Sequence, residues 1–171
     1  MNLPTRLSIF FLVTSIALSA CTATGPSNSS SKSTLATVTS SSSAACPVTE
    51  PAWVKPPEDS AVQNPPAHGY YYVNEDSSIW SSAWWTGEEE YPLRAGEEQG
   101  NKVGWFRPAG AKLEITGQRL DAQAPPLEAH VPCCYPTRFQ ATGIYFPTEG
   151  CWEVTAKAAD SVLSFVVRVE P

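Results

Sequence analysis

WEVTAK, residues 152–157, alternates apolar and polar side chains without interruption. Alternation with a period of two is typical of a β-strand that buries one face, so its tryptophan, valine and alanine are predicted to face a core. Residues 162–169 repeat the pattern, with a leucine, a phenylalanine and two valines on one face. The short segment 158–161 separates the two runs, and the sequence therefore predicts a hairpin.

Six further strands are predicted upstream, where similar runs recur between Pro, Gly and Asp residues. They comprise residues 69–73, 79–85, 103–107, 112–118, 127–131 and 139–146. In the last of them the apolar phase shifts at Gly143, which predicts a β-bulge or a bend. Because no stretch of this region has a helical period, the sequence indicates an all-β domain.

Residues 149–152, Glu-Gly-Cys-Trp, lie where a turn meets the WEVTAK strand. The segment 138–169 resembles an immunoglobulin-like domain here, because such domains open the penultimate strand with an acid, a glycine, any residue and an aromatic ring. Trp152 replaces the usual tyrosine, and Cys151 precedes the aromatic residue instead of following it by two positions. The resemblance implies an immunoglobulin-like antiparallel β-sandwich and no particular activity, with a short barrel as the alternative.

Four of the five cysteines, Cys46, Cys133, Cys134 and Cys151, belong to this domain. Outside the cytoplasm an even number favours disulfides, and four cysteines allow three connectivities. The preferred interpretation joins Cys46 and Cys151 separately to the adjacent pair, and a vicinal Cys133–Cys134 bridge is the alternative. Because Cys151 precedes the core-facing Trp152, its side chain is predicted to point away from the core.

His130, Cys133 and Cys134 also place one imidazole and two thiols within five positions. These ligands suit a soft ion such as Cu(I), so a copper-handling protein is an alternative function. Zinc sites usually separate paired cysteines by two to four residues, and adjacent cysteines fit that spacing poorly. No resident metal or other cofactor is therefore predicted.

Aromatic residues are concentrated between positions 70 and 106. Strand neighbours point to opposite faces, so some of these rings are predicted to be exposed and to bind sugars, peptides or amines. The alternative is that the segments 51–68 and 86–101 cover the second face and turn the rings into a satellite core. The candidate binding residues are Tyr71, Trp80, Trp84, Trp85 and Trp105.

Composition and motifs narrow the function further. The chain has 11 Lys and Arg against 17 Asp and Glu, and a formal net charge of −6, which argues against a nucleic-acid partner. It has no nucleophile elbow, no zinc-protease motif, no phosphate loop and no dinucleotide fingerprint, so the protein is not predicted to be an enzyme. The acidic runs at residues 88–90 and 97–98 are interpreted as solvated loops.

The N-terminus has the layout of a secretory signal. An apolar run over residues 7–17 is shorter than the roughly 20 residues that span a bilayer, and small residues follow it. Leu18-Ser19-Ala20-Cys21 resembles the lipobox of bacterial lipoproteins, which implies cleavage after residue 20 and lipid attachment to Cys21. An ordinary secretory peptide is the alternative.

Three regions follow from this reading: a signal peptide at 1–20, a lipidated cysteine with a flexible Ser/Thr-rich linker at 21–45, and a β-sandwich domain at 46–171. The sequence therefore predicts a lipoprotein on the cell membrane or outer membrane, facing outside the cytoplasm. Its partners are predicted to be membrane lipid, through Cys21, and an envelope glycan or protein, through the aromatic face.

Overall fold

The computed structural model describes residues 45–87, 91–133 and 135–171, which lie within a compact unit spanning Ser41–Pro171. The predicted signal peptide at 1–20, Cys21 and the predicted linker up to residue 44 lie outside the described residues. Within the described part, no helix is long and apolar enough to cross a membrane. The elements are β1 (Ala52–Val54), β2 (Gly69–Val73), β3 (Trp80–Ser82), the 3-10 helix η1 (Trp84–Thr86), β4 (Asn101–Phe106), β5 (Leu113–Arg119), β6 (Glu128–His130), β7 (Phe139–Tyr145), β8 (Gly150–Ala158) and β9 (Ser161–Val169).

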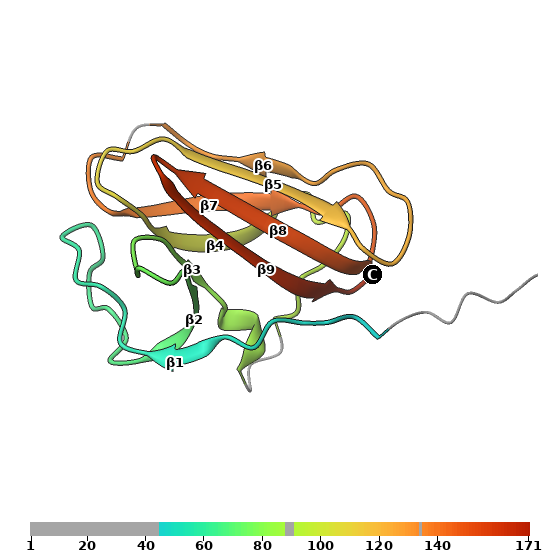
Figure 1. The fold of residues 1–171 in the computed structure, drawn as a ribbon, viewed down its shortest axis with the longest axis horizontal. Coiled ribbons are helices and arrows are strands. Elements are labelled where there is room, and N and C mark those ends of the chain that lie inside the picture. The colour runs from blue at the N-terminus through green and yellow to red at the C-terminus, as the bar shows by residue number, and fades with distance from the viewer. Residues whose placement is uncertain (1–44, 88–90, 134) are drawn as a thin grey trace, which may run out of the picture. The chain divides into compact units, whose positions relative to one another are not determined.

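The strands form two antiparallel sheets that pack as a sandwich-like fold (Figure 1). The larger sheet has the order β1-β2-β3-β4-β7-β6, and the smaller has the order β5-β8-β9. The predicted hairpin is the β8–β9 pair, in which Val154 lies opposite Phe165. The all-β prediction is confirmed, and the predicted barrel alternative is wrong because the two sheets remain separate.

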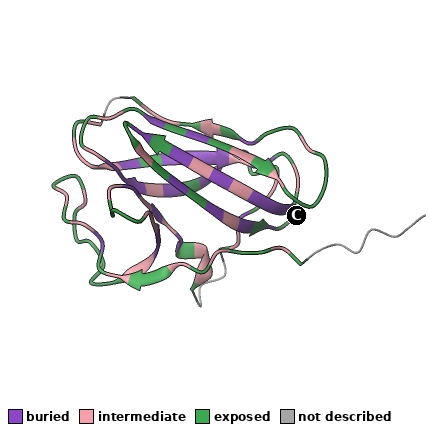
Figure 2. Ribbon diagram, in the orientation of Figure 1, coloured by how far each residue is buried: buried purple, intermediate pink, exposed green. Residues whose placement is uncertain are grey.

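The core lies between the sheets and follows the predicted alternation on β8 and β9. Trp152, Val154 and Ala156 from β8 are at most 1% exposed, and the apolar residues at alternate positions of β9 are at most 5% exposed. Figure 2 shows buried and exposed residues alternating along strands of the smaller sheet. The larger sheet contributes Trp105, which is fully buried.

Strand β7 corrects the prediction of a bulge at Gly143. Its register with β4 is continuous from Phe106↔Phe139 to Asn101↔Ile144, with Lys102 opposite Gly143. The face of β7 that points to the core carries two buried polar residues, Gln140 and Thr142, ahead of Ile144. Thr142 is tolerated there because its hydroxyl accepts a hydrogen bond from Trp105 Nε1 at 2.9 Å. The apparent phase shift therefore reflects partnered polar residues on an unbroken face.

The prediction of one strand over residues 79–85 is also wrong. β3 ends at Ser82, and the chain then turns into η1, which carries Trp84 and Trp85. Strand β1 was not predicted, because it is only three residues long and lies at the edge of the sheet next to prolines.

The disulfide corrects the preferred cysteine pairing, because Cys46 and Cys151 are joined directly, with 5.4 Å between their Cα atoms. The segment after Cys46 runs beside β9, where Thr49 N donates to Val166 O and Val166 N donates to Thr49 Oγ1, each at 2.9 Å. Cys151 lies on the face away from Trp152, opposite the exposed Arg168, and is itself only 1% exposed.

Cys133 is disulfide-bonded as well, and its partner is not among the described residues. Cys134 lies outside the described residues, so the vicinal alternative is neither supported nor contradicted.

Candidate functional site

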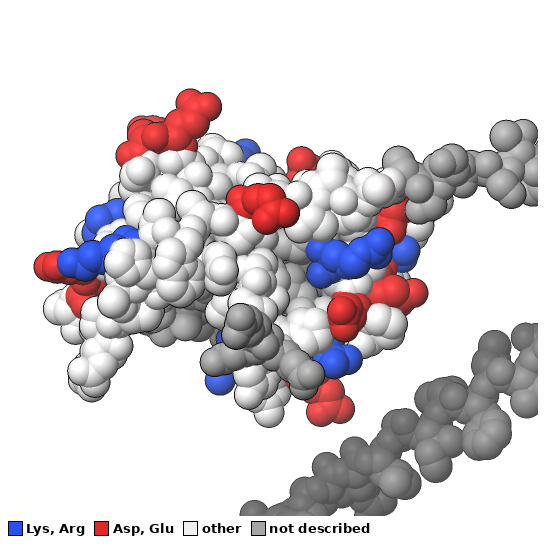
Figure 3. Space-filling model, turned by 90° about the horizontal axis from the view of Figure 1, so that it is seen from below, with Lys and Arg blue, Asp and Glu red and all other residues white. Residues whose placement is uncertain are grey.

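A surface groove lies between η1, the start of β4 and the connection that joins them. Its volume is about 580 Å³, and Trp84, Tyr91, Arg94, Glu97 and Lys102 contribute to its lining. η1 and β1 lie at the bottom of Figure 1, and Figure 3 views the molecule from that side, where groups of Lys and Arg and of Asp and Glu are set in a mostly uncharged surface. We refer to this cavity as the aromatic groove.

Two exposed rings face each other in the aromatic groove. Trp84 is 41% exposed and Tyr91 is 60% exposed, and their ring centroids are 6.0 Å apart in an edge-to-face arrangement. The Trp84 indole is held in place because its Nε1 donates a hydrogen bond to Lys102 O at 2.9 Å. A ring with its one polar atom already bonded presents mainly apolar surface to a ligand.

A series of ring contacts connects Trp84 to the core. Trp84 lies edge-on to Trp85 at 5.8 Å, Trp85 lies 6.2 Å from Tyr72, and Tyr72 stacks on Phe165 of β9 at 4.1 Å. Each ring restricts the rotamers of the next, since rings packed on both sides cannot turn without a clash. The exposed Trp84 is therefore a preorganised surface and does not have to be ordered by its ligand.

The other wall is fixed by Asn101, which is only 7% exposed. Its Oδ1 accepts a hydrogen bond from Arg94 N at 2.8 Å, and its Nδ2 donates to Arg94 O at 2.9 Å and to Ile144 O at 3.1 Å. Gly100, with a φ of +69°, allows the chain to turn there, and a Cβ at that position would lie 2.9 Å from the Tyr145 ring. The loop that carries Arg94 and Glu97 is therefore pinned to β4 and β7.

Charged side chains surround the Trp84 and Tyr91 rings of the aromatic groove. Arg94 and Glu97 from the loop and Lys102 from β4 are exposed at the aromatic groove. Flat rings flanked by hydrogen-bonding groups of both charges suit a ligand that has apolar faces and a hydroxylated or amide edge. Among the described residues, no group of three His, Cys, Asp or Glu is arranged to hold a metal ion.

No protein-family model, curated protein or solved structure matches the chain.

The structure separates the five predicted binding residues. Trp84 lines the groove, Trp85 is half-buried beneath it, and Trp80 is half-buried on the outer face of the larger sheet. Tyr71 and Trp105, at 7% and 0% exposure, are buried, which corrects the expectation that their rings are exposed; ligand binding by them stays a prediction. Trp105 faces the core, while Tyr71 packs against Trp80 and Phe106 on the opposite face.

The connection between β1 and β2 is attached to the larger sheet through Asp59. The Asp59 carboxylate accepts hydrogen bonds from Arg138 N at 2.7 Å and Phe139 N at 3.0 Å, which fixes this connection at the start of β7, and its Pro56 is buried. On the outer face of the sheet Tyr71 is thus buried among other rings, whereas Trp84 stays exposed. Tyr91 and the 60% exposed Trp53 were not among the predicted binding residues.

The residues of the copper alternative lie at the far end of β6. His130 and Cys133 are both exposed, and Cys133 is in a disulfide, so it offers no thiolate in this state. Because Cys134 is outside the described residues, copper binding stays an untested prediction.

Tyr72, one of the rings that connect Trp84 to the core, is expected to make the folded domain less stable at alkaline pH. Its hydroxyl is buried and has no hydrogen-bond partner of good geometry among the described residues. Burial raises the pKa of Tyr72 to about 12, and the nearby Trp85 side chain lowers it only in part. A tyrosine in the unfolded chain ionises at about pH 10, so the stability that depends on the neutral Tyr72 is complete below that pH and is lost as the pH rises toward 12.

We expect Tyr72→Phe to remove this dependence. Relative to its own value at pH 8, the unfolding free energy of the variant should fall by about 1 kcal/mol less than that of the wild type by pH 11. Denaturant titrations at the two pH values measure the difference. An equal fall of the unfolding free energy in both proteins would show that Tyr72 is not the cause of the pH dependence.

Proposed function

We propose that this protein is an extracytoplasmic lipoprotein, held on a membrane through Cys21, whose domain is a non-catalytic binding module for an envelope glycan. The Cys46–Cys151 disulfide supports the compartment, because such bridges persist mainly outside the cytoplasm. The lipobox-like residues 18–21 and the polar stretch that follows them support the anchor.

The domain itself is proposed to be immunoglobulin-like. In constant-type immunoglobulin domains, strands A-B-E-D form one sheet and C-F-G the other. The order β3-β4-β7-β6 opposite β5-β8-β9 corresponds to this arrangement, with β1 and β2 added at the edge. The corner also fits, because Trp152 Nε1 donates to Thr148 O at 3.0 Å, as the tyrosine corner bonds to the backbone a few residues upstream.

The observation that carries the glycan proposal is the exposed Trp84–Tyr91 pair with its charged rim. A pyranose ring has one apolar face that can pack on an indole and an edge of hydroxyl groups that can bond to charged side chains. Lys102 and Glu97 lie beside the rings and provide a donor and an acceptor for that edge. A flat apolar partner protein would leave these rim charges desolvated, which costs binding free energy.

Replacing Trp84 by alanine is expected to weaken glycan binding at least tenfold, which corresponds to about 1.4 kcal/mol. The probe is a tetramer of β-1,4-linked N-acetylglucosamine, added to the full chain carrying Cys21→Ser so that no lipid is attached. Titration by intrinsic fluorescence and calorimetry measures the dissociation constant.

Trp53→Ala is the matched control, because Trp53 is as exposed as Tyr91 but contacts His68 and Tyr70 outside the aromatic groove. It should leave the dissociation constant unchanged. An equal loss in both variants, or no saturable binding of the tetramer to the parent chain, would rule out glycan recognition by this groove.

A further inference from the structure

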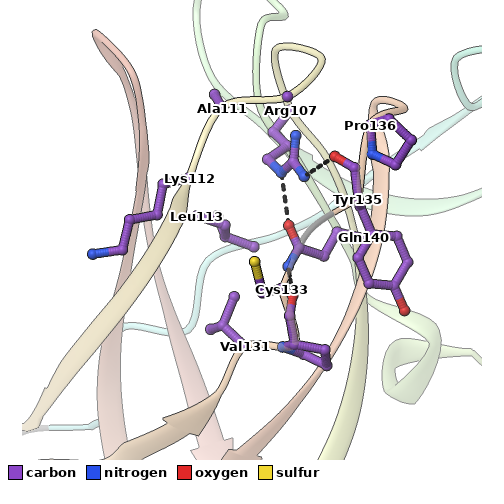
Figure 4. Close-up of a pocket in the computed structure, with 11 residues that line it drawn as sticks. Arg107, Ala111, Lys112, Leu113, Val131, Cys133, Tyr135, Pro136 and Gln140 are labelled. Carbon is purple, nitrogen blue, oxygen red and sulfur yellow. Dashed lines mark hydrogen bonds between the residues drawn. The ribbon is translucent and has the colours of Figure 1, made fainter.

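A second cavity opens at the other end of β4, between the β4–β5 and β6–β7 connections (Figure 4). Its volume is about 450 Å³, and Leu113, Val131 and Pro136 form apolar walls. Asn101 at the aromatic groove begins β4, and Arg107 at this cavity directly follows the end of that strand, six residues further or about 20 Å away. The two sites are therefore separate, and we refer to this one as the end cavity.

The buried guanidinium of Arg107 lies at the floor of the end cavity and is 2% exposed. Its Nε donates to Gln140 Oε1 at 2.7 Å, its Nη1 donates to Pro108 O at 2.9 Å and Thr137 O at 3.3 Å, and its Nη2 donates to Tyr135 O at 3.0 Å. A guanidinium has five N–H donors, and these bonds use four of them. One Nη2 hydrogen is left without an acceptor among the described residues.

Gln140 contributes a second spare donor. Its Oε1 is occupied by Arg107, and its Nε2 donates one hydrogen to Pro132 O at 2.7 Å. An amide nitrogen carries two hydrogens, so the other has no acceptor among the described residues. Figure 4 shows Gln140, Leu113 and the sulfur of Cys133 around the same space, whereas Lys112 extends away from it.

The charge of Arg107 is not balanced by an ion pair in the described part of the chain. Asp59 is the acidic group that acts on it electrostatically, but the Asp59 carboxylate is bonded to the backbone N–H groups of Ala61, Arg138 and Phe139. Desolvation by burial accordingly lowers the pKa of Arg107. A buried cation with neutral oxygen partners favours the approach of an anion.

We propose that the end cavity binds a small monocarboxylate with an apolar body. The carboxylate would accept hydrogen bonds from the spare N–H groups of Arg107 and Gln140. The apolar body would pack against Leu113, Val131 and Pro136. Charge-assisted bonds of this type are roughly twice as strong as neutral ones, so the carboxylate fixes the orientation while the apolar walls add affinity. The size of the cavity falls in the usual range for small-molecule sites.

The test compares three ligands with one eight-carbon tail: octanoate, 1-octanol and octylammonium. Each is titrated into the full chain carrying Cys21→Ser, and nitrogen–proton NMR follows the side-chain signals of Arg107 and Gln140. We expect saturable binding of octanoate, at least tenfold tighter than that of octanol, no binding of octylammonium, and shifts of the Gln140 amide signals. Equal binding of octanoate and octanol, or no saturable binding, overturns the proposal.

Two variants separate the floor from the surface. Gln140→Glu keeps the side-chain shape and gives Arg107 a carboxylate of its own, although it also replaces the Nε2 donor to Pro132 O by an oxygen. Octanoate binding should fall at least tenfold, and retained octanol binding shows that the apolar walls are intact. Lys112→Ala removes an exposed charge that points away from the cavity and pairs with Glu114, so octanoate binding should not change. If octanoate binding instead fell in Lys112→Ala and was unchanged in Gln140→Glu, the carboxylate would bind at the surface near Lys112, and the proposal would be overturned. If Gln140→Glu does not fold, the ligand series alone decides.

Discussion

Cys151→Ser is expected to lower the free energy of unfolding by about 4 kcal/mol and the melting temperature by roughly 15 °C. The bridge closes a loop between residues 105 positions apart, which removes a large part of the conformational entropy of the unfolded chain. It also fixes the entry segment, which otherwise touches β9 chiefly through the two Thr49–Val166 hydrogen bonds. Thermal and denaturant unfolding of the two proteins measure the effect.

Cys46→Ser should have the same effect, and the double variant should be no less stable than either single one, because all three lose one bridge. Additive losses would mean that each cysteine contributes separately. A loss in either single variant below about 1 kcal/mol would show that the bridge does not set the stability of the domain.

Cys21→Ser is expected to move essentially all of the protein from the membrane fraction to the soluble fraction. Each buried methylene of an acyl chain contributes about 0.8 kcal/mol, and stable anchoring requires more than one chain, so losing the thiol that is proposed to carry the lipid removes the whole anchor. Fractionation of cells and immunoblotting measure the distribution.

A matched control is Cys133→Ser, which removes a cysteine of the domain and should leave the protein in the membrane fraction. If Cys21→Ser stayed with the membrane as well, the attachment would have to reside in another part of the chain.

Strands with one apolar face were predictable from sequence, as β8 and β9 show. Their cores consist of residues that hydropathy alone identifies, such as Trp152 and Phe165. β7 was misread because Gln140 and Thr142 occupy core positions, and what makes them acceptable is a distant partner, Arg107 or Trp105, that no local pattern indicates. The disulfide partner of Cys46 was not predictable for the same reason. Cys46 reaches Cys151 because the segment after it lies beside β9, and no local pattern indicates that contact.

The site was predictable in composition but not in geometry. The dense aromatic segment indicated that some rings would be exposed, and Trp84 is one of them. Trp84 and Trp85 were predicted to lie on a strand, but they lie on η1. Tyr71 is buried because its ring packs against Trp80 and Phe106, and strand alternation alone does not show which rings of one face cover one another.

Intact mass and peptide mapping of the protein purified from membranes, without reduction, test the central claim that a disulfide-bonded domain is tethered through Cys21. The expected result is a chain beginning at Cys21 with an acyl modification on its thiol, and a crosslinked peptide that joins Cys46 to Cys151. An unmodified Cys21, or Cys46 linked to Cys133, would contradict it.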